Sequence, residues 1–236
     1  MAGAPVGYVP VANADEVTRS EFITRVYQHL LLAVAAFVAF EALLINLGVA
    51  RALYEVIASQ RGAWLLVLGG FMIVNWLAAN AAHDLLNPSR QYGGLFALAA
   101  AQALIFAPFL HLFFEVLDDG ATTVVAAGAV TALGFAGLTA VAFTTRRDLS
   151  FLRPLVLWGF VSALVLIVSA VLFGWELGVW FSVAMITLAG GSILYQTQTI
   201  IRRYPSEAYV GAAVQLFASV MLLFWYVLRL FAQLRR

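Results

Sequence analysis

Seven long apolar stretches, separated by short polar breaks, constrain the fold of this chain more than any other feature of its sequence. Each is about 20 residues or longer, the length at which an α-helix crosses the roughly 30 Å hydrocarbon core of a bilayer. The breaks between them contain charged residues, prolines and glycines, which end helices. The stretches that we expect to span the membrane cover residues 26–50, 63–82, 92–114, 122–144, 154–173, 177–198 and 209–231.

The composition supports the same interpretation. The chain is 64% hydrophobic and 11% charged, whereas a soluble domain has about 25% charged residues. So few charges cannot cover a soluble surface, and the lipid bilayer must therefore cover most of the molecule. We predict an all-α membrane protein, with a tail over residues 1–21 and a seven-helix transmembrane domain over residues 22–236.

The charged and reactive residues exclude several classes of protein. A net charge of +1 gives no basic face for nucleic acid. The absence of cysteine excludes disulfides, thiolate metal sites and cysteine nucleophiles. All 13 basic residues are arginine, so the lysine Schiff base of retinal proteins and of pyridoxal phosphate enzymes cannot form. We expect no cofactor and no enzymatic activity.

The arginines are distributed unequally between the two sides of the predicted bundle. Eight lie in the tail or in loops on the side of the N-terminus, and five lie on the other side. An excess of arginine marks the cytoplasmic side, so we expect a cytoplasmic N-terminus and, after seven helices, a periplasmic C-terminus. The arginine-only, alanine-rich composition is typical of a GC-rich bacterial genome, and the predicted location is the bacterial inner membrane.

Two charged residues fall inside predicted spans. Glu41 lies about 15 residues into the first span, roughly 20 Å from its start. Arg229 lies about 20 residues into the last span, roughly 30 Å along and near the same side of the membrane. One hypothesis is an ion pair between Glu41 and Arg229. The alternative is that Arg229 extends to the outer headgroups while Glu41 bonds to a hydroxyl group or water.

The sixth and seventh predicted helices each carry a polar stripe. Side chains at helical spacing on one face of the sixth helix are Ser192, Gln196, Thr199 and Arg203. Small and polar residues along one side of the seventh helix are Gly211, Gln215, Ser219, Tyr226 and Arg229. The two stripes could line a water path, or they could join the two helices by hydrogen bonds, which is the commoner use.

The histidines and one glycine–serine motif are weaker candidates. His29 and His83 could lie near the same ends of the first two helices and bind a metal or haem, but no metal-binding spacing accompanies them or His111. The motif Gly190-Gly191-Ser192 is similar to the nucleophile of an intramembrane serine protease. That chemistry needs a partner base, and the three histidines lie far upstream. We therefore assign no metal, no cofactor and no catalytic residue.

Several motifs together resemble a known family of membrane proteins. They are the segments 132–139 and 142–152 around the fourth helix, 192–201 in the sixth helix, 209–213 at the start of the seventh and 228–230 near its end. In the length and order of its helices the chain also resembles this family, the Bax inhibitor family, also called TMBIM or YccA-like. The resemblance implies seven helices with the last one central, wrapped by the other six.

The resemblance also implies a site at which this chain differs. Some members of the family are pH-sensitive calcium leak channels, in which one aspartate on the sixth helix and one on the seventh share a proton and hold the cytoplasmic gate. Here Gln196 and Ser219 occupy these two gate positions. Neither side chain titrates near neutral pH or offers calcium a charge, so the calcium-leak role is weakened, although the two can hydrogen-bond to each other.

The branch of the family typified by YccA is similar to this chain in lacking the second aspartate. That branch is associated with the membrane AAA protease FtsH, which extracts and degrades its members through the cytoplasmic N-terminal tail. Residues 1–18 look disordered and suit such a handle. The leading hypothesis is a non-enzymatic modulator of an FtsH-type protease or of a stress response. The alternative is a pH-sensitive leak for calcium or other cations through the region of the sixth and seventh helices.

Overall fold

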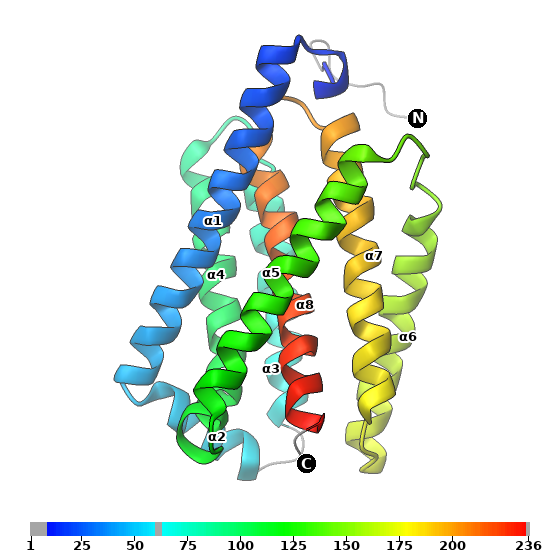
Figure 1. The fold of residues 1–236 in the computed structure, drawn as a ribbon. Coiled ribbons are helices and arrows are strands. Elements are labelled where there is room, and N and C mark those ends of the chain that lie inside the picture. Colours follow the sequence, from blue (N-terminus) through cyan, green and yellow to red (C-terminus); the bar gives the residue numbers. More distant parts are fainter. Residues whose placement is uncertain (1–8, 60–62, 235–236) are drawn as a thin grey trace.

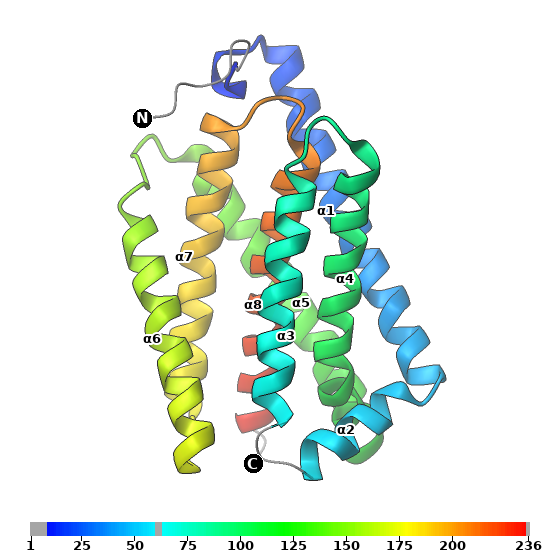
Figure 2. The same cartoon turned by 180° about the vertical axis from the view of Figure 1, so that it is seen from behind.

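The computed structural model describes residues 9–59 and 63–234 (Figure 1). Within these residues the chain is a bundle of helices that run up and down along one common direction (Figures 1 and 2). A short 3-10 turn, η1, precedes α1, and a π-helical turn, η2, follows α4. The elements are η1 (Val11–Asn13), α1 (Glu16–Asn46), α2 (Val49–Ser59), α3 (Ala63–Ala82), α4 (Pro88–His111), η2 (Leu112–Val116), α5 (Gly120–Thr144), α6 (Leu152–Phe173), α7 (Val179–Arg203) and α8 (Tyr209–Leu234).

Seven helices in the described part of the chain are long and apolar enough to cross a membrane, and only α2 is not. This confirms the predicted fold class of an all-α, multi-pass membrane protein. Six of the seven predicted stretches agree with helices to within five residues at each end. The largest of these differences is at α7, which continues to Arg203 and stops before Tyr204 and Pro205, because a residue that precedes proline disfavours the helical conformation.

The first predicted span, residues 26–50, was wrong at both ends. Helix α1 begins at Glu16, where the side chain of Asp15 caps it by accepting a hydrogen bond of 3.0 Å from the backbone N–H of Thr18. It ends at Asn46, two residues before Gly48, which adopts a φ of +72° that glycine tolerates. A separate amphipathic helix, α2, follows at once. The apolar run continues through this turn, so the predicted span included the first two residues of α2, and the charged residues that follow indicated a break where the structure has the rest of this helix.

Helix α8 is central, as predicted. In its most apolar stretch 72% of the residues are buried, against 11% in α3, α5 and α6. It packs against α1, α3, α4, α5 and α7, and it lies in the middle of the bundle when seen from either side (Figures 1 and 2). Small side chains at its start, Gly211, Ala212 and Ala213, allow these neighbours to approach.

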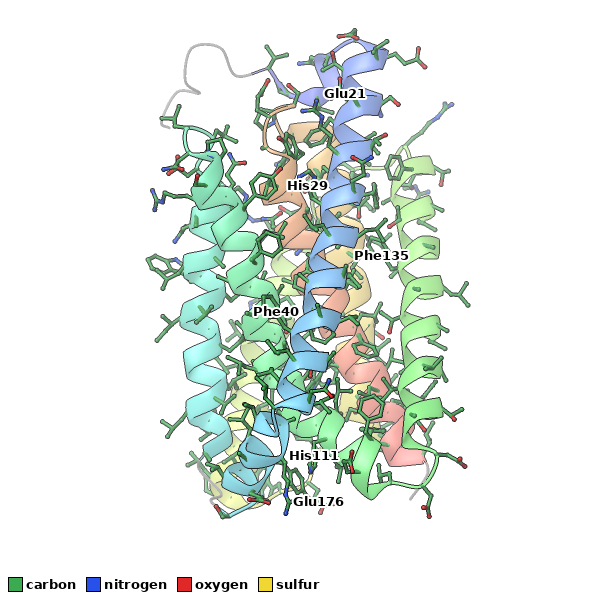
Figure 3. All side chains as sticks on the ribbon, turned by 90° about the vertical axis from the view of Figure 1, so that its left-hand side faces the viewer. Glu21, His29, Phe40, His111, Phe135 and Glu176 are labelled. Atoms are coloured by element: carbon green, nitrogen blue, oxygen red, sulfur yellow. The ribbon has the colours of Figure 1, made fainter. Side chains whose placement is uncertain are left out.

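The bundle has two distinct ends. Glu21 and His29 lie toward one end, and His111 and Glu176 lie at the other (Figure 3). The first, here called the N-terminal end, also holds the loops between α3 and α4, α5 and α6, and α7 and α8 (Figures 1 and 2). The second, the C-terminal end, holds α2, the loops between α4 and α5 and between α6 and α7, and the end of α8.

Part of the predicted tail is packed onto the bundle. The backbone N–H of Val11 donates a hydrogen bond of 2.8 Å to the carbonyl of Tyr204, and Pro10 forms a β-bridge with Pro205. The side chain of Val11 is fully buried and belongs to the main hydrophobic core. Residues 9–15 are therefore held against the loop between α7 and α8, whereas residues 1–8 of the predicted handle lie outside the described residues.

Helices α3 and α4 pack closely at Gly94, which gives a direct test of the fold. A Cβ atom on Gly94 would lie 2.6 Å from the backbone carbonyl of Ala78, so Gly94→Ala should push the two helices apart and cost about 1–3 kcal/mol. The neighbouring Gly93 has no atom within 4 Å of such a Cβ, and Gly93→Ala should be neutral or stabilising by up to about 1 kcal/mol. Thermal unfolding in detergent measures both, and equal effects would contradict this packing.

Candidate functional site

Three neutral polar side chains form a closed hydrogen-bonded ring between α7 and α8. The amide nitrogen Nε2 of Gln196 donates to Ser192 Oγ (3.0 Å), and the hydroxyl of Ser219 donates to Gln196 Oε1 (2.9 Å). Ser192 Oγ and Ser219 Oγ lie 3.1 Å apart. Because Ser219 already uses its proton, Ser192 must donate across this last contact. We call these three residues the polar ring.

The positions of the polar ring follow from helix geometry. Ser192 and Gln196 are four residues apart and therefore lie on the same face of α7, and Ser219 meets them from α8. Ser192 and Ser219 are buried, so any group without a partner here would carry the full cost of desolvation. The ring pairs these groups with one another and contains no charge. The two gate positions predicted from the sequence, Gln196 and Ser219, are thus in direct contact.

The other members of the two predicted stripes are not joined to the ring. Thr199 donates within its own helix to the carbonyl of Tyr195 (2.8 Å). Gln215 accepts from the hydroxyl of Tyr204 (2.8 Å), and Arg203 donates to Ser150 Oγ in the loop between α5 and α6 (3.0 Å). Hydrogen bonds join one stripe to the other at the level of the ring.

The loop that Arg203 contacts contains an anchored acid. Asp148 accepts hydrogen bonds from the hydroxyl (2.7 Å) and the backbone N–H (2.9 Å) of Ser150. The hydroxyl bond lowers the pKa of Asp148 below its usual value, and the nearby charges of Arg202 and Arg203 lower it further. The carboxylate is thus ionised at neutral pH and stays at the membrane surface, away from the polar ring.

A second residue of α7 holds the same loop and was missed by the sequence analysis. The side chain of Gln198 is buried, accepts from the backbone N–H of Leu149 (2.6 Å) and donates to the carbonyl of Arg147 (2.8 Å). Two residues along a helix rotate a side chain by about 200°, so Gln198 points away from the ring. Gln198 and the ring residue Gln196 are the same residue type, so polarity alone does not distinguish their roles. The direction in which each side chain points around the axis of α7 does.

A cavity of about 870 Å³ reaches the polar ring from the C-terminal half of the bundle. Its walls come from α3, α4, α6, α7 and α8, together with the loop between α6 and α7. Its lining is mainly apolar and aromatic and includes Phe71, Phe106, Phe109 and Trp225. The polar ring lies in one part of this lining, and Arg229 lies ten residues further along α8.

The predicted ion pair between Glu41 and Arg229 is not formed. Arg229 Nη2 donates to the carbonyl of Leu177 (2.8 Å), and its guanidinium carbon lies 5.7 Å from the centre of the Phe181 ring. Glu41 is buried, and neither of its carboxylate oxygens has a hydrogen-bond partner in the structure. The sequence suggested two alternatives for Glu41, an ion pair with Arg229 or a hydrogen bond to a hydroxyl group or water. Within the described residues, neither Arg229 nor a protein hydroxyl group bonds to it. Arg229 contacts α7 and the loop before it, and not Glu41 on α1.

His29 and His83 take part in hydrogen bonds, and His111 lies against the ring of Tyr54. His29 Nδ1 donates to the carbonyl of Arg25 (2.7 Å) while Nε2 lies 2.9 Å from the hydroxyl of Tyr92. His83 Nε2 lies 3.2 Å from the hydroxyl of Tyr204. Among residues 9–59 and 63–234, no group of three or more His, Asp or Glu side chains is placed to hold a metal ion.

Comparisons with known proteins match most of the chain. The model of a protein family described as "Inhibitor of apoptosis-promoting Bax1" matches residues 19–236. Uncharacterized protein PA2604 of Pseudomonas aeruginosa is similar to the chain, with 32% identity over 139 residues. The matched region covers 58% of this chain and 61% of that protein, so the match spans less than two thirds of the relative's length.

The polar ring predicts that removing the hydroxyl of Ser219 destabilises the protein much more than removing the hydroxyl of Thr199. Ser219→Ala removes the partner of Gln196 Oε1 and of the Ser192 hydroxyl, and the loss of a partner for one half-buried and one buried group should destabilise the protein by about 1–3 kcal/mol. Thr199→Val removes a hydroxyl that bonds only within its own helix, and it should change stability by less than about 0.5 kcal/mol. Thermal unfolding of both variants in the same detergent checks this, and a similar loss in both would show that the ring contributes nothing special.

Proposed function

Since the chain belongs to the Bax inhibitor family, we propose that it is a non-enzymatic inner-membrane protein that modulates a membrane protease of the FtsH type or a stress response. The observation that carries this proposal is the neutral polar ring. In leak channels of the family, two aspartates at these positions share a proton. Two carboxylates at close range cannot both ionise easily, whereas an amide and two hydroxyls have no such response to pH.

The packed part of the tail supports the same proposal. A protease that pulls on the N-terminus must first release residues 9–15 from the loop between α7 and α8, because Val11 is buried there and bonded to Tyr204. Only after that can the pull reach α1, whose first turn is capped by Asp15. A substrate that resists extraction in this way is degraded slowly and occupies the protease, which is how it would act as a modulator.

The proposed orientation places this tail in the cytoplasm. The described arginines at the N-terminal end of the bundle are Arg19, Arg25, Arg90, Arg146, Arg147, Arg153, Arg202 and Arg203. Those toward the C-terminal end are Arg51 and Arg229, while Arg61, Arg235 and Arg236 of the predicted outer side lie outside the described residues. The excess of arginine supports a cytoplasmic N-terminal end and a periplasmic C-terminal end.

Docking of the tail predicts how fast the protein is degraded. Val11→Asp removes about 1.5–3 kcal/mol of apolar burial and should raise the undocked fraction roughly tenfold or more. We expect a severalfold shorter half-life in cells that contain the protease and no change in cells that lack it. The matched control is Val9→Asp, because Val9 is 55% exposed and its change leaves docking intact. Pulse-chase labelling measures the half-lives.

Two results would contradict the proposal in different ways. Equal half-lives for the Val11 and Val9 variants would show that docking does not limit extraction. A wild-type half-life that does not depend on the protease at all would overturn the proposed modulation itself.

A second candidate function is a cation leak, and the cavity that reaches the polar ring favours it. Calcium flux through the wild-type protein tests this function, and the double variant Gln196→Asp with Ser219→Asp tests whether the scaffold can conduct: it should show a flux that changes between acid and neutral pH, because the pair can then share a proton. The neutral control is Gln196→Asn with Ser219→Thr. Liposomes loaded with a calcium indicator measure the flux. A pH-dependent flux through the wild-type protein would show that the leak does not need the aspartates.

A further inference from the structure

Arg229 is a charged side chain that forms no ion pair with a carboxylate in the described part of the chain. In the described part of the chain the ion pairs join Arg25 to Glu21, Arg51 to Glu55 and Arg90 to Asp84. Arg229 is half-buried, donates to one backbone carbonyl and lies over an aromatic ring. A guanidinium that is partly removed from water without an anion is costly, which points to an anionic partner from outside the chain.

The position of Arg229 corresponds to the depth of lipid headgroups. Arg229 Nη2 and Gln233 Nε2 donate to the same carbonyl, that of Leu177, at 2.8 and 3.0 Å, and this carbonyl belongs to the loop between α6 and α7. Helix α8 ends five residues after Arg229. Glu176 of the same loop lies at the C-terminal end of the molecule (Figure 3). Exposed Trp175 and Trp180 flank this loop, as is typical of the interface between hydrocarbon and water.

The cavity leads from Arg229 into the hydrocarbon layer. Between Arg229 and Ser219, about 15 Å along α8, it is lined by Trp225 and Leu222 from α8. Helices α3 and α6 both line it, yet they make no extensive contact with each other, and α8 lies between them when the bundle is seen from behind (Figure 2). The groove between α3 and α6 therefore faces lipid.

We propose that this cavity binds an anionic phospholipid of the surrounding bilayer, with its phosphate on Arg229 and an acyl chain between α3 and α6. A guanidinium offers phosphate parallel N–H donors, and basic pockets between transmembrane helices are known headgroup sites. The apolar walls select a lipid over a soluble anion. The volume of about 870 Å³ lies in the range of about 300–1,000 Å³ that is usual for ligand sites.

One charge at the mouth of the cavity opposes the proposed ligand. Glu176 lines the same cavity, is exposed, and makes no ion pair with residues 9–59 or 63–234. Its carboxylate repels a phosphate while Arg229 attracts it. The two residues therefore predict mutational effects of opposite sign on one ligand.

Native mass spectrometry of the full-length protein in detergent tests the proposal with two probes, phosphatidylglycerol and phosphatidylcholine. The wild type should retain phosphatidylglycerol in preference to phosphatidylcholine. Arg229→Gln should weaken this preference about tenfold or more, and Glu176→Gln should strengthen it. Equal retention of the two lipids by the wild type, or an unchanged preference in the Arg229 variant, would overturn the proposal.

A pair of neighbouring residues on α6 tests the acyl chain separately from the headgroup. Val171 lines the cavity, whereas Leu172 is 69% exposed on the lipid side. Val171→Trp should fill the groove and reduce retention of both lipids, and Leu172→Trp should not. Since both variants keep Arg229, this result holds even if the Arg229 variant folds poorly.

Two further outcomes would overturn the proposal. If the Val171 variant retained as much lipid as the Leu172 variant, the acyl chain would not lie in the cavity. If inorganic phosphate displaced phosphatidylglycerol completely, the site would bind a free anion and not a lipid. None of these measurements involves the protease or calcium flux, so they are independent of the proposed function.

Discussion

The burial of α8 inside the bundle is the constraint on which the other features depend. A helix surrounded by protein has no water to satisfy its polar groups, so each polar side chain on it must find a partner on a neighbouring helix. Ser219 finds Gln196 and Ser192, Gln215 finds Tyr204, and Arg229 finds the carbonyl of Leu177. These bonds fix α8 against α7 and against the loops at both ends. The small residues at the start of α8 then allow α3 and α4 to close on its other side.

Tyr204 connects the two ends of the sequence. Its carbonyl accepts from Val11 in the tail, and its hydroxyl bonds to Gln215 of α8 and lies near His83 at the end of α3. The N-terminal tail is thus attached to Tyr204 at the end of α7. Four loop residues separate Tyr204 from the start of the central helix α8. Release of the tail would remove a hydrogen bond and a buried valine from this connection, so the proposed handle and the helix pair that carries the polar ring are mechanically linked.

Much of the fold could be predicted from the sequence, and the limits have a physical cause. Length and hydropathy located seven spans, because a bilayer sets the length of a helix whatever its neighbours are. They did not predict α2, since the apolar run passes through the turn at Gly48 and ends at residue 50, and the charged residues after it indicated a loop. Helical spacing placed Ser192 and Gln196 on one face, and the family resemblance placed Ser219 opposite them. Glu41 and Arg229 are not in contact, because counting residues gives only a position along each helix, while the direction that a helix face points depends on tertiary packing.

The polar ring and the cavity beneath it are physically consistent with each other. A pair of aspartates at the ring would need a proton, a cation or water to be stable, and the cavity that reaches them would have to be wet. An amide and two hydroxyls that bond to one another carry no charge, so an acyl chain can approach them without breaking these three hydrogen bonds. A neutral ring at this place thus does more than lack a proton switch. It turns the inner end of the cavity into a surface that hydrocarbon can cover, while the one charge that stays in the cavity wall of α8, Arg229, lies at the depth of the headgroups.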